Sequence, residues 1–166
     1  MLRKCLLQFA FALLVLAGQG LGLSRPAPAQ DASPFAKLAG RWLGEGRLGA
    51  RDGKTENVKC RVTYVVAASA SEVRQTIRCA TQSGGVEVQS TVTHASGVLS
   101  GTWKELSREW SGDLAGSVTP HGLKVAIKGS ELRANMDIIV KDNRQIIEIQ
   151  FIDSALTGLT LILTKG

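Results

Sequence analysis

The chain of 166 residues is poor in the side chains that catalytic and metal sites most often use. It contains two histidines, His94 and His121, and has no nucleophile elbow, no His-x-His or HExxH pattern and no phosphate-binding glycine loop. His121 lies in a Pro-His-Gly turn, and the carboxylates Glu105 and Glu109 flank another turn, where charges are normally solvated. The sequence therefore predicts neither an enzyme nor a metal or cofactor site.

The chain also lacks a block of basic residues. The whole chain has a net charge of +6, whereas residues 30–166 alone carry +3. The difference arises because residues 1–29 contain three basic residues, Arg3, Lys4 and Arg25, and no acidic residue. The remaining charges alternate in sign along the chain, which is typical of a solvated surface rather than of nucleic-acid binding. We expect no nucleic-acid partner.

The one long hydrophobic run lies at the N-terminus. Arg3 and Lys4 precede an apolar run over residues 6–18, and Ala27-Pro28-Ala29 supplies the small-x-small pattern that a signal peptidase reads. The sequence thus predicts a signal peptide over residues 1–29 and a periplasmic or secreted protein. A retained anchor is the alternative, but the run is shorter than the about 20 residues of a membrane helix, so we expect no stable span after cleavage.

Cysteine is scarce, and the two that follow this leader predict a disulfide. Cys5 precedes the apolar run and should leave with the signal, so Cys60 and Cys79 remain. A hairpin over residues 57–82, folded at 68–70, places them directly opposite each other, at the separation a disulfide needs. Export makes the bond the default, and two cysteines without a nearby histidine are a poor zinc ligand set.

The apolar alternation in this hairpin selects the same register as the cysteines. Side chains alternate between the two faces of a strand, so each face holds its own set of cross-strand pairs. The inner pairs are Val62–Ile77, Tyr64–Gln75 and Val66–Val73, and the outer face carries Arg61 and Thr63 against Arg78 and Thr76. That agreement is the strongest structural signal in the chain.

Turn signals elsewhere recur at close to the spacing of an all-β domain. They separate about ten expected strands, at residues 40–49, 55–67, 72–82, 86–95, 98–105, 110–118, 122–128, 131–141, 144–152 and 158–164. Before the first strand, Ser33 and Pro34 are suited to begin a single helical turn. Short hairpins imply an antiparallel up-and-down meander, and closure into a β-barrel of 8–10 strands would hide its edges. A two-sheet sandwich is the alternative, and we expect one domain over residues 30–166.

The same alternation predicts which side chains face the interior. They are Trp42, Leu48, Val86, Val88, Val92, Leu99, Trp103, Trp110, Leu114, Val118, Leu123, Val125, Ile127, Leu132, Met136, Ile138, Val140, Ile147, Ile149, Phe151, Leu159, Leu161 and Leu163. The second half of this set is almost uninterrupted and aliphatic, as a packed wall requires. In the first half, polar and glycine positions interrupt the set.

The polar inward positions of the first half define a candidate binding site. A two-residue turn at 84–85 would pair Gln75 with His94, which continues the row begun by Tyr64. A turn at 96–97 would then pair Ser90 with Trp103. The predicted ligand-binding residues are Trp42, Tyr64, Gln75, His94 and Trp103.

Glycines fall on the same face, at Gly44, Gly46, Gly101, Gly112 and Gly116. Small residues beside aromatic ones leave space, and a few convergent polar groups in apolar surroundings are typical of a small-molecule pocket. The structural alternative stays open: the polar side chains would bond one another to close the barrel end, and the glycines would let the strands bend.

Two short motifs resemble known barrels. Leu38-Ala39-Gly40-Arg41-Trp42 resembles the Gly-x-Trp opening of lipocalins and related calycin barrels, and Gly101-Thr102-Trp103 looks like a second copy. The resemblance implies a calycin-like fold that carries a small hydrophobic molecule, and a basic residue near the last strand packing on the tryptophan, for which only Lys165 is placed. GRWLGEG, residues 40–46, also resembles nitrobindin-type haem barrels, but residues 159–165 lack the iron-binding histidine of that family, so we expect no haem.

The sequence therefore predicts an exported, calycin-like barrel that binds a small, mostly apolar molecule. The alternative is a cell-envelope interaction or inhibitor protein that acts through surface loops at residues 50–55, 106–109 and 119–122 and has a filled interior. The sequence does not specify a ligand or an oligomeric state.

Overall fold

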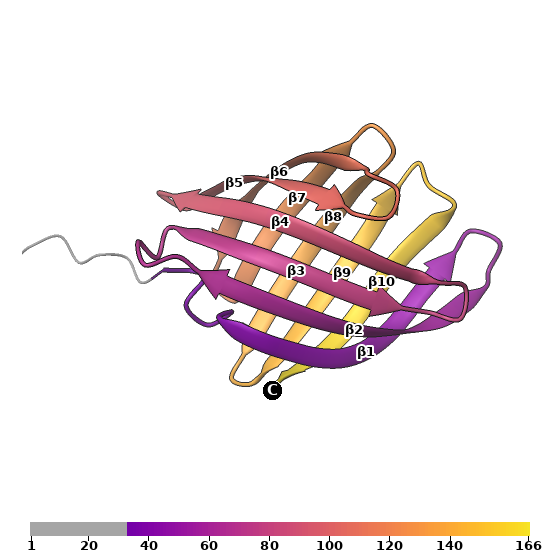
Figure 1. Ribbon diagram of the computed structural model, residues 1–166, viewed down its shortest axis with the longest axis horizontal. Coiled ribbons are helices and arrows are strands. Elements are labelled where there is room, and N and C mark those ends of the chain that lie inside the picture. The colour runs from indigo at the N-terminus through magenta and orange to yellow at the C-terminus, as the bar shows by residue number, and fades with distance from the viewer. Residues whose placement is uncertain (1–32) are drawn as a thin grey trace, which may run out of the picture. The chain divides into compact units, whose positions relative to one another are not determined.

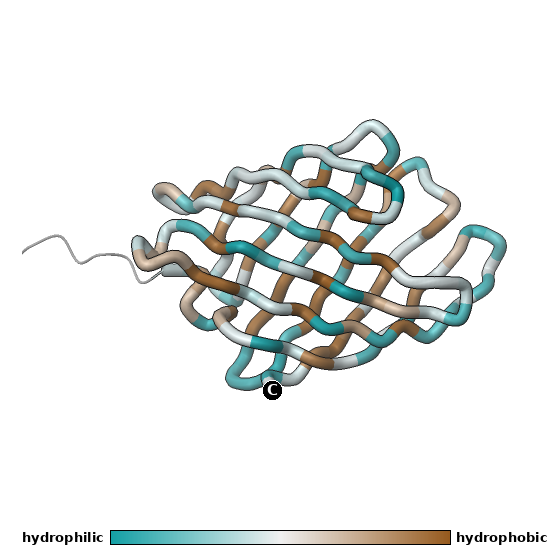
Figure 2. The backbone as a smooth tube through the Cα atoms, in the orientation of Figure 1, coloured by the Kyte–Doolittle hydropathy of each residue, from teal (hydrophilic) through white to brown (hydrophobic). Residues whose placement is uncertain are grey.

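Ten strands alternate inward apolar and outward polar residues in the computed structural model, which describes residues 33–166 (Figures 1 and 2). The strands are β1 (Gly40–Ala50), β2 (Thr55–Val66), β3 (Glu72–Ala80), β4 (Gly85–Ala95), β5 (Val98–Glu105), β6 (Ser111–Thr119), β7 (Gly122–Gly129), β8 (Arg133–Lys141), β9 (Arg144–Ile152) and β10 (Leu156–Lys165). All ten expected strands are present, with ends that differ by at most two residues. The predicted signal peptide lies outside the described residues.

The meander closes into a barrel, as predicted, and does not split into two sheets. Each strand pairs antiparallel with the next, and β10 returns to pair with β1, so Trp42 lies opposite Lys165. Closure pairs the two edges that an open sheet would expose. Within residues 33–166, no helix is long and apolar enough to cross a membrane.

Antiparallel order places alternate turns at opposite ends of this barrel. We call one the closed end, because the segment before β1 covers it together with turns 67–71, 96–97, 120–121 and 142–143. The other is the open end, formed by turns 51–54, 81–84, 106–110, 130–132 and 153–155. Figure 1 shows the β1–β2 and β3–β4 turns together at the open end.

The closed end is plugged by the turn that the sequence predicts at residues 33–38. The Ser33 hydroxyl accepts a hydrogen bond from the backbone N–H of Phe35 at 3.2 Å, and the Phe35 ring is fully buried. The Trp42 indole N–H donates to the Leu38 carbonyl at 2.7 Å, and the Lys165 ammonium lies 5.4 Å from the centroid of the Trp42 ring. The basic residue that the lipocalin resemblance implies is therefore in place.

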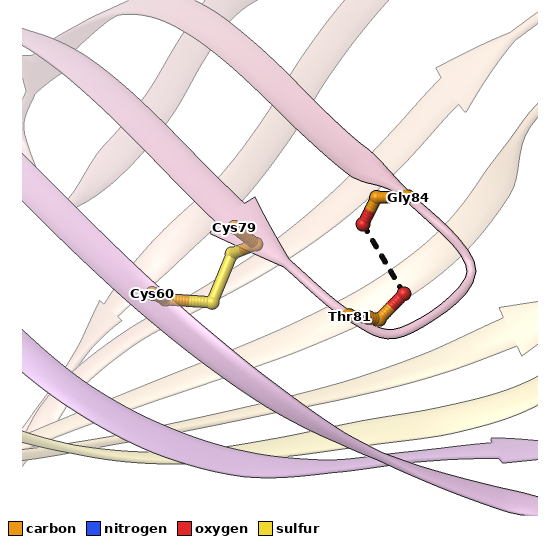
Figure 3. The surroundings of a disulfide bond; sticks show 4 residues. All are labelled: Cys60, Cys79, Thr81 and Gly84. Atoms are coloured by element: carbon orange, nitrogen blue, oxygen red, sulfur yellow. Dashed lines mark hydrogen bonds between the residues drawn. A yellow bond between two sulfur atoms is a disulfide. The ribbon is translucent and has the colours of Figure 1, made fainter.

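The first hairpin has the predicted register throughout, including Cys60 opposite Cys79 and Tyr64 opposite Gln75. The two cysteines form a disulfide with their Cα atoms 4.2 Å apart (Figure 3). Cys60 is buried, so the bond links β2 to β3 from the inside of the barrel. Both independent signals in the sequence, alternation and cysteine spacing, selected the correct pairing.

The next hairpin differs from the prediction. Its turn spans residues 81–84 and is closed by the Thr81 N–H, which donates to the Gly84 carbonyl at 2.8 Å. The Thr81 hydroxyl donates to the same carbonyl at 3.2 Å, the bond drawn in Figure 3. Gln75 therefore pairs with Ser90, and the predicted Gln75–His94 pair was wrong. The shift is an even number of residues, so both side chains keep their inward orientation. The pair Ser90–Trp103 is confirmed.

The inward glycines allow neighbouring strands to lie close together. A Cβ on Gly44 would overlap the carbonyl oxygen of Ile162, and one on Gly101 would overlap that of Thr91. Side chains there would push neighbouring strands apart at points where the barrel wall bends. At Gly129 the space is filled by the Trp103 indole, whose Cζ2 would lie 2.8 Å from a Cβ. A Cβ on Gly46, Gly112 or Gly116 would also overlap a carbonyl oxygen of the neighbouring strand, so the expectation that glycines leave open space was wrong at all five predicted positions.

Loss of the disulfide should destabilise the barrel without changing its fold. The bond spans 19 positions of sequence, and closing a loop of this size constrains the unfolded chain by about 3 kcal/mol in the entropic account. We expect Cys60→Ala/Cys79→Ala to lower the free energy of unfolding in urea by about that amount. The wild type in reductant is the matched control and should unfold like the variant; an unchanged midpoint for both would show that the bond adds no stability.

Candidate functional site

The open end of the barrel is lined by apolar side chains that water still reaches. Twelve hydrophobic side chains pack against the core while only partly buried, and nine of them lie toward the open end. They are Leu48, Ile77, Cys79, Val88, Trp110, Ile127, Leu132, Ile149 and Leu159. The side chains that plug the closed end, such as Phe35 and Leu38, are 0–1% exposed. The interior is thus sealed at one end and has an accessible apolar mouth at the other.

A row of uncharged polar groups leads from the closed end toward that mouth. The Ser90 hydroxyl donates to the Gln75 side-chain carbonyl at 2.9 Å, and the Gln75 amide donates to the Tyr64 hydroxyl oxygen at 3.2 Å. The amide of Gln145 donates to the same oxygen at 2.8 Å from β9, across the barrel. All four side chains are at most 9% exposed. We call Tyr64, Gln75, Ser90 and Gln145 the polar row.

Ser90 and Gln145 were not among the predicted site residues, and of the two only Ser90 was expected on the inner face, so Gln145 is the member that sequence reasoning missed entirely. Its position was detectable, because it precedes Ile147 and Ile149 at the inward spacing of β9, but its partner Tyr64 is 81 residues away. The Gln145 side-chain carbonyl oxygen is buried with no hydrogen-bond partner among the described residues. A buried amide oxygen without a hydrogen-bond partner costs about 1–3 kcal/mol, so the burial of Gln145 lowers the stability of the folded state.

The Tyr64 hydroxyl is held in its neutral form. Burial raises its pKa above the usual value, and the hydrogen bonds from Gln145 and Gln75 offset that effect only in part. A phenolate would have to be desolvated here, since no cation lies beside the hydroxyl among its hydrogen-bond partners. The polar row is therefore electrically neutral.

The other predicted site residues lie at different heights in the barrel. His94 packs edge-on against Phe35, with ring centroids 6.2 Å apart, and its Nε2 accepts the Gly97 N–H at 2.9 Å. His94 and the fully buried Trp42 thus belong to the closed-end plug. Trp103 lies near the open end, where its indole N–H points to the Lys128 carbonyl at 3.4 Å. The five predicted residues do not converge on one point: Tyr64 and Gln75 do so, together with Ser90 and Gln145.

Glu105 is buried, contrary to the expectation of a solvated charge. Its side-chain oxygens accept the N–H groups of Ser107 at 3.0 Å and of Arg108 at 2.6 Å, which orders the 106–110 turn. Burial acts to raise the pKa of this carboxyl, but the two N–H groups and the nearby Arg108 charge outweigh it and hold the pKa below its usual value. Glu109 is exposed, so the two carboxylates form no acid–base pair.

Two hollows lie against the strands of the barrel wall, and their lining includes the inward Gln75, Ser90 and Trp103 beside outward residues. One, of about 1190 Å³, runs over β10, β1, β2 and β3, and the other, of about 670 Å³, over β3 to β6. Their side chains are mostly outward and polar, such as Lys59, Arg61 and Lys104. Across residues 33–166, no three side chains of His, Cys, Asp or Glu are grouped closely enough to hold a metal ion.

Solved structures share this architecture. Rv2717c from M. tuberculosis aligns with a TM-score of 0.67 and 14% identity, over 86% of this chain and 99% of that one. The S-type phycobiliprotein lyase CPES from Guillardia theta aligns with a TM-score of 0.60 and 8% identity, over 80% and 90%. The fold is calycin-like. At these identities the similarity concerns the fold alone, and no protein-family model or curated protein sequence matches the chain.

Removing the Tyr64 hydroxyl should cost more stability than removing the Gln145 amide. Tyr64→Phe leaves two buried amide groups without their acceptor, and we expect a loss of about 2–4 kcal/mol in urea unfolding. Gln145→Leu removes the unpartnered oxygen along with one hydrogen bond, so its loss should stay below about 1 kcal/mol. Equal losses for the two variants would contradict this account of the row.

Because the chain has a single tyrosine, phenolate absorbance reports on Tyr64 alone. Its folded pKa lies above the unfolded value of about 10, so its contribution to stability is complete below that pH and is lost as pH rises further. We expect no phenolate signal in folded protein at pH 10 and a stability that falls above it. Tyr64→Phe is the control and should show a smaller fall; phenolate at its ordinary pKa in folded protein would refute the burial effect.

Proposed function

We propose that this domain binds a small, mostly apolar molecule in the open end of the barrel. The observation that carries the proposal is the uneven distribution of inward, partly exposed hydrophobic side chains: nine lie toward the open end, and three, Val66, Val118 and Val140, lie toward the plugged end. Apolar area that remains in contact with water gains about 25 cal/mol per Å² when a ligand covers it. Apolar side chains with a few polar groups among them are the usual lining of a small-molecule site.

The polar row favours a ligand whose polar group is uncharged. Ser90 and Gln75 are the most exposed members of the row, at 9% and 8%, and offer a hydroxyl and an amide to a ligand. Tyr64 and Gln145 lie deeper and, with the closed-end plug, form the floor of the site. A carboxylate or ammonium would be desolvated here without an opposite charge in the row, at a cost of several kcal/mol. Trp103, near the mouth, adds an aromatic wall.

The polar row favours binding without catalysis. One fold neighbour is named as a phycobiliprotein lyase, but the row of this chain offers only neutral groups, so we propose that it binds its ligand without chemistry.

The Cys60–Cys79 bond is typical of an oxidising compartment. We therefore propose that the domain acts in the periplasm or outside the cell.

The loop-based interaction protein is the less supported candidate. Its three loops do not form one surface: residues 50–55 and 106–109 lie at the open end, whereas 119–122 lies at the closed end. A partner that contacted all three would have to span the length of the barrel. The ordered 106–110 turn therefore fits better as part of the rim of the mouth.

Titration with the neutral, apolar dye N-phenyl-1-naphthylamine tests the proposal. We expect saturable dye fluorescence, excited in part by energy transfer from Trp103 and Trp110, and about tenfold weaker binding for Ile127→Lys and Ile149→Lys, which place a charge in the mouth. Val65→Lys, at a 56% exposed outward position, is the matched control and should bind normally.

Circular dichroism of each variant establishes that it is folded before binding is compared. Absence of saturable binding to the wild type, or equal binding by the mouth and control variants, would refute the lumen site. Native mass spectrometry of the protein from its own cells then identifies the natural ligand by its added mass.

A further inference from the structure

The outer wall of the barrel carries a row of isoleucines where polar residues are expected. Ile139 on β8 pairs with Ile146 on β9, and Ile146 pairs with Ile162 on β10, so the three lie side by side across three strands. Ile139 is 41% and Ile162 47% exposed, and Ile146 is partly buried between them. Leu43, on the neighbouring β1, is 45% exposed. Contiguous exposed hydrophobic side chains mark interaction surfaces.

Opposite charges flank this isoleucine row on its two sides. Lys141 and Arg144 are paired across β8 and β9 on the side toward the closed end, whereas Asp137 and Glu148 are paired across the same strands toward the open end. Asp137 faces Lys124 of β7, with 3.6 Å between the charged atoms. Within residues 33–166, no ion pair within 4.0 Å involves Lys141, Arg144 or Glu148.

We propose that this face is the interface of a symmetric homodimer. The two-fold axis runs along the isoleucine row, in the plane of the interface. It brings the same face of a second copy against the first, with the basic flank of one copy over the acidic flank of the other. Arg144 of each copy then lies over Glu148 of the other, and Lys141 over Asp137, with the isoleucines in contact between them. An interface of this kind uses the same patch on both copies and must be self-complementary, which this charge pattern is.

The charges also disfavour an axis perpendicular to the row. A two-fold axis along the strands would place Arg144 over Arg144 and Glu148 over Glu148, and like charges in contact are repelled. A different protein as the partner would leave the matched flanks without an explanation, since the basic and acidic pairs lie on the same two strands at equal distance from the row. The second copy is therefore the occupant that the pattern specifies.

The size of the patch sets the strength of the dimer. Three rows on three strands cover roughly 300 Å² at the spacings of a β-sheet. A stable interface buries about 800 Å² on each partner, so the contact must extend and should remain weak. It extends toward β7, where Gly122 pairs with Ile139, because on β1 the exposed Glu45 pairs with Ile162 and would meet Glu45 of the second copy. We expect a concentration-dependent dimer with a dissociation constant in the micromolar range.

Sedimentation velocity on the mature protein over the micromolar range tests this inference. We expect the wild type to shift from monomer to dimer as concentration rises, and Ile139→Lys and Ile162→Lys to weaken association by about tenfold or more. Val98→Lys is the matched control, because Val98 is 61% exposed on β5, away from the row, and its substitution should leave association unchanged.

A charge exchange tests the direction of the symmetry axis. Glu148→Arg and Arg144→Glu should each weaken the dimer, because each creates a like-charged pair across the proposed interface. The double variant restores opposite charges and should regain association, whereas a merely structural effect of either change would persist. A wild type that stays monomeric throughout, an isoleucine variant that dimerises normally, or a double variant no better than the singles would overturn the proposal.

Dye binding in the lumen separates this inference from the proposed function. The isoleucine row faces outward, so Ile162→Lys should take up N-phenyl-1-naphthylamine as the wild type does. A wild type that dimerises but takes up no dye would overturn the lumen site alone, and a wild type that takes up dye but stays monomeric would overturn the dimer alone.

Discussion

The pairing of β10 with β1 is the constraint on which the rest of this structure depends. It gives every strand two hydrogen-bonded neighbours, and it forces one face of a single sheet to enclose the whole core. Closure also demands sharp bending of the wall, which explains why Gly44 and Gly101 stand where a Cβ would overlap the next strand. The two ends then differ only in what covers them: the chain before β1 plugs one and nothing in the described residues plugs the other.

The plug and the polar row set the depth of the interior. Trp42 is fixed from two sides, by the Leu38 carbonyl at its N–H and by the Lys165 ammonium near its ring, so the segment before β1 and the end of β10 lock together. Above it, the bond from Gln145 to Tyr64 crosses the barrel and sets its floor. The closed end is thus held by specific polar contacts, whereas most of the partly exposed apolar side chains lie toward the open end.

The outer wall and the lumen are separate surfaces of the same strands. On β9, Ile147 and Ile149 face the core while Ile146 and Glu148 face outward, so one strand contributes to the proposed ligand site and to the proposed dimer interface. Period-two alternation keeps these roles independent, because neighbouring residues project to opposite faces. A dimer formed through β8 to β10 would leave the mouth unobstructed, since the mouth lies at the end of the barrel.

Local patterns determined the strands, the all-β meander and the first hairpin, because alternation and turn residues act over a few positions and the cysteines supplied an independent check on register. The β3–β4 register was missed because a Gly-Gly pair is compatible with turns of different length, and only the Thr81–Gly84 bond decides among them. The first hairpin predicted Gln75 opposite Tyr64, but the second partner of Tyr64, Gln145, could not be predicted, since it reaches the hydroxyl from β9. The sequence by itself thus determined, for most strands, which residues face inward. Only the tertiary structure decided which inward residues contact one another, because barrel closure and strand tilt place residues of distant strands at the same level along the barrel axis.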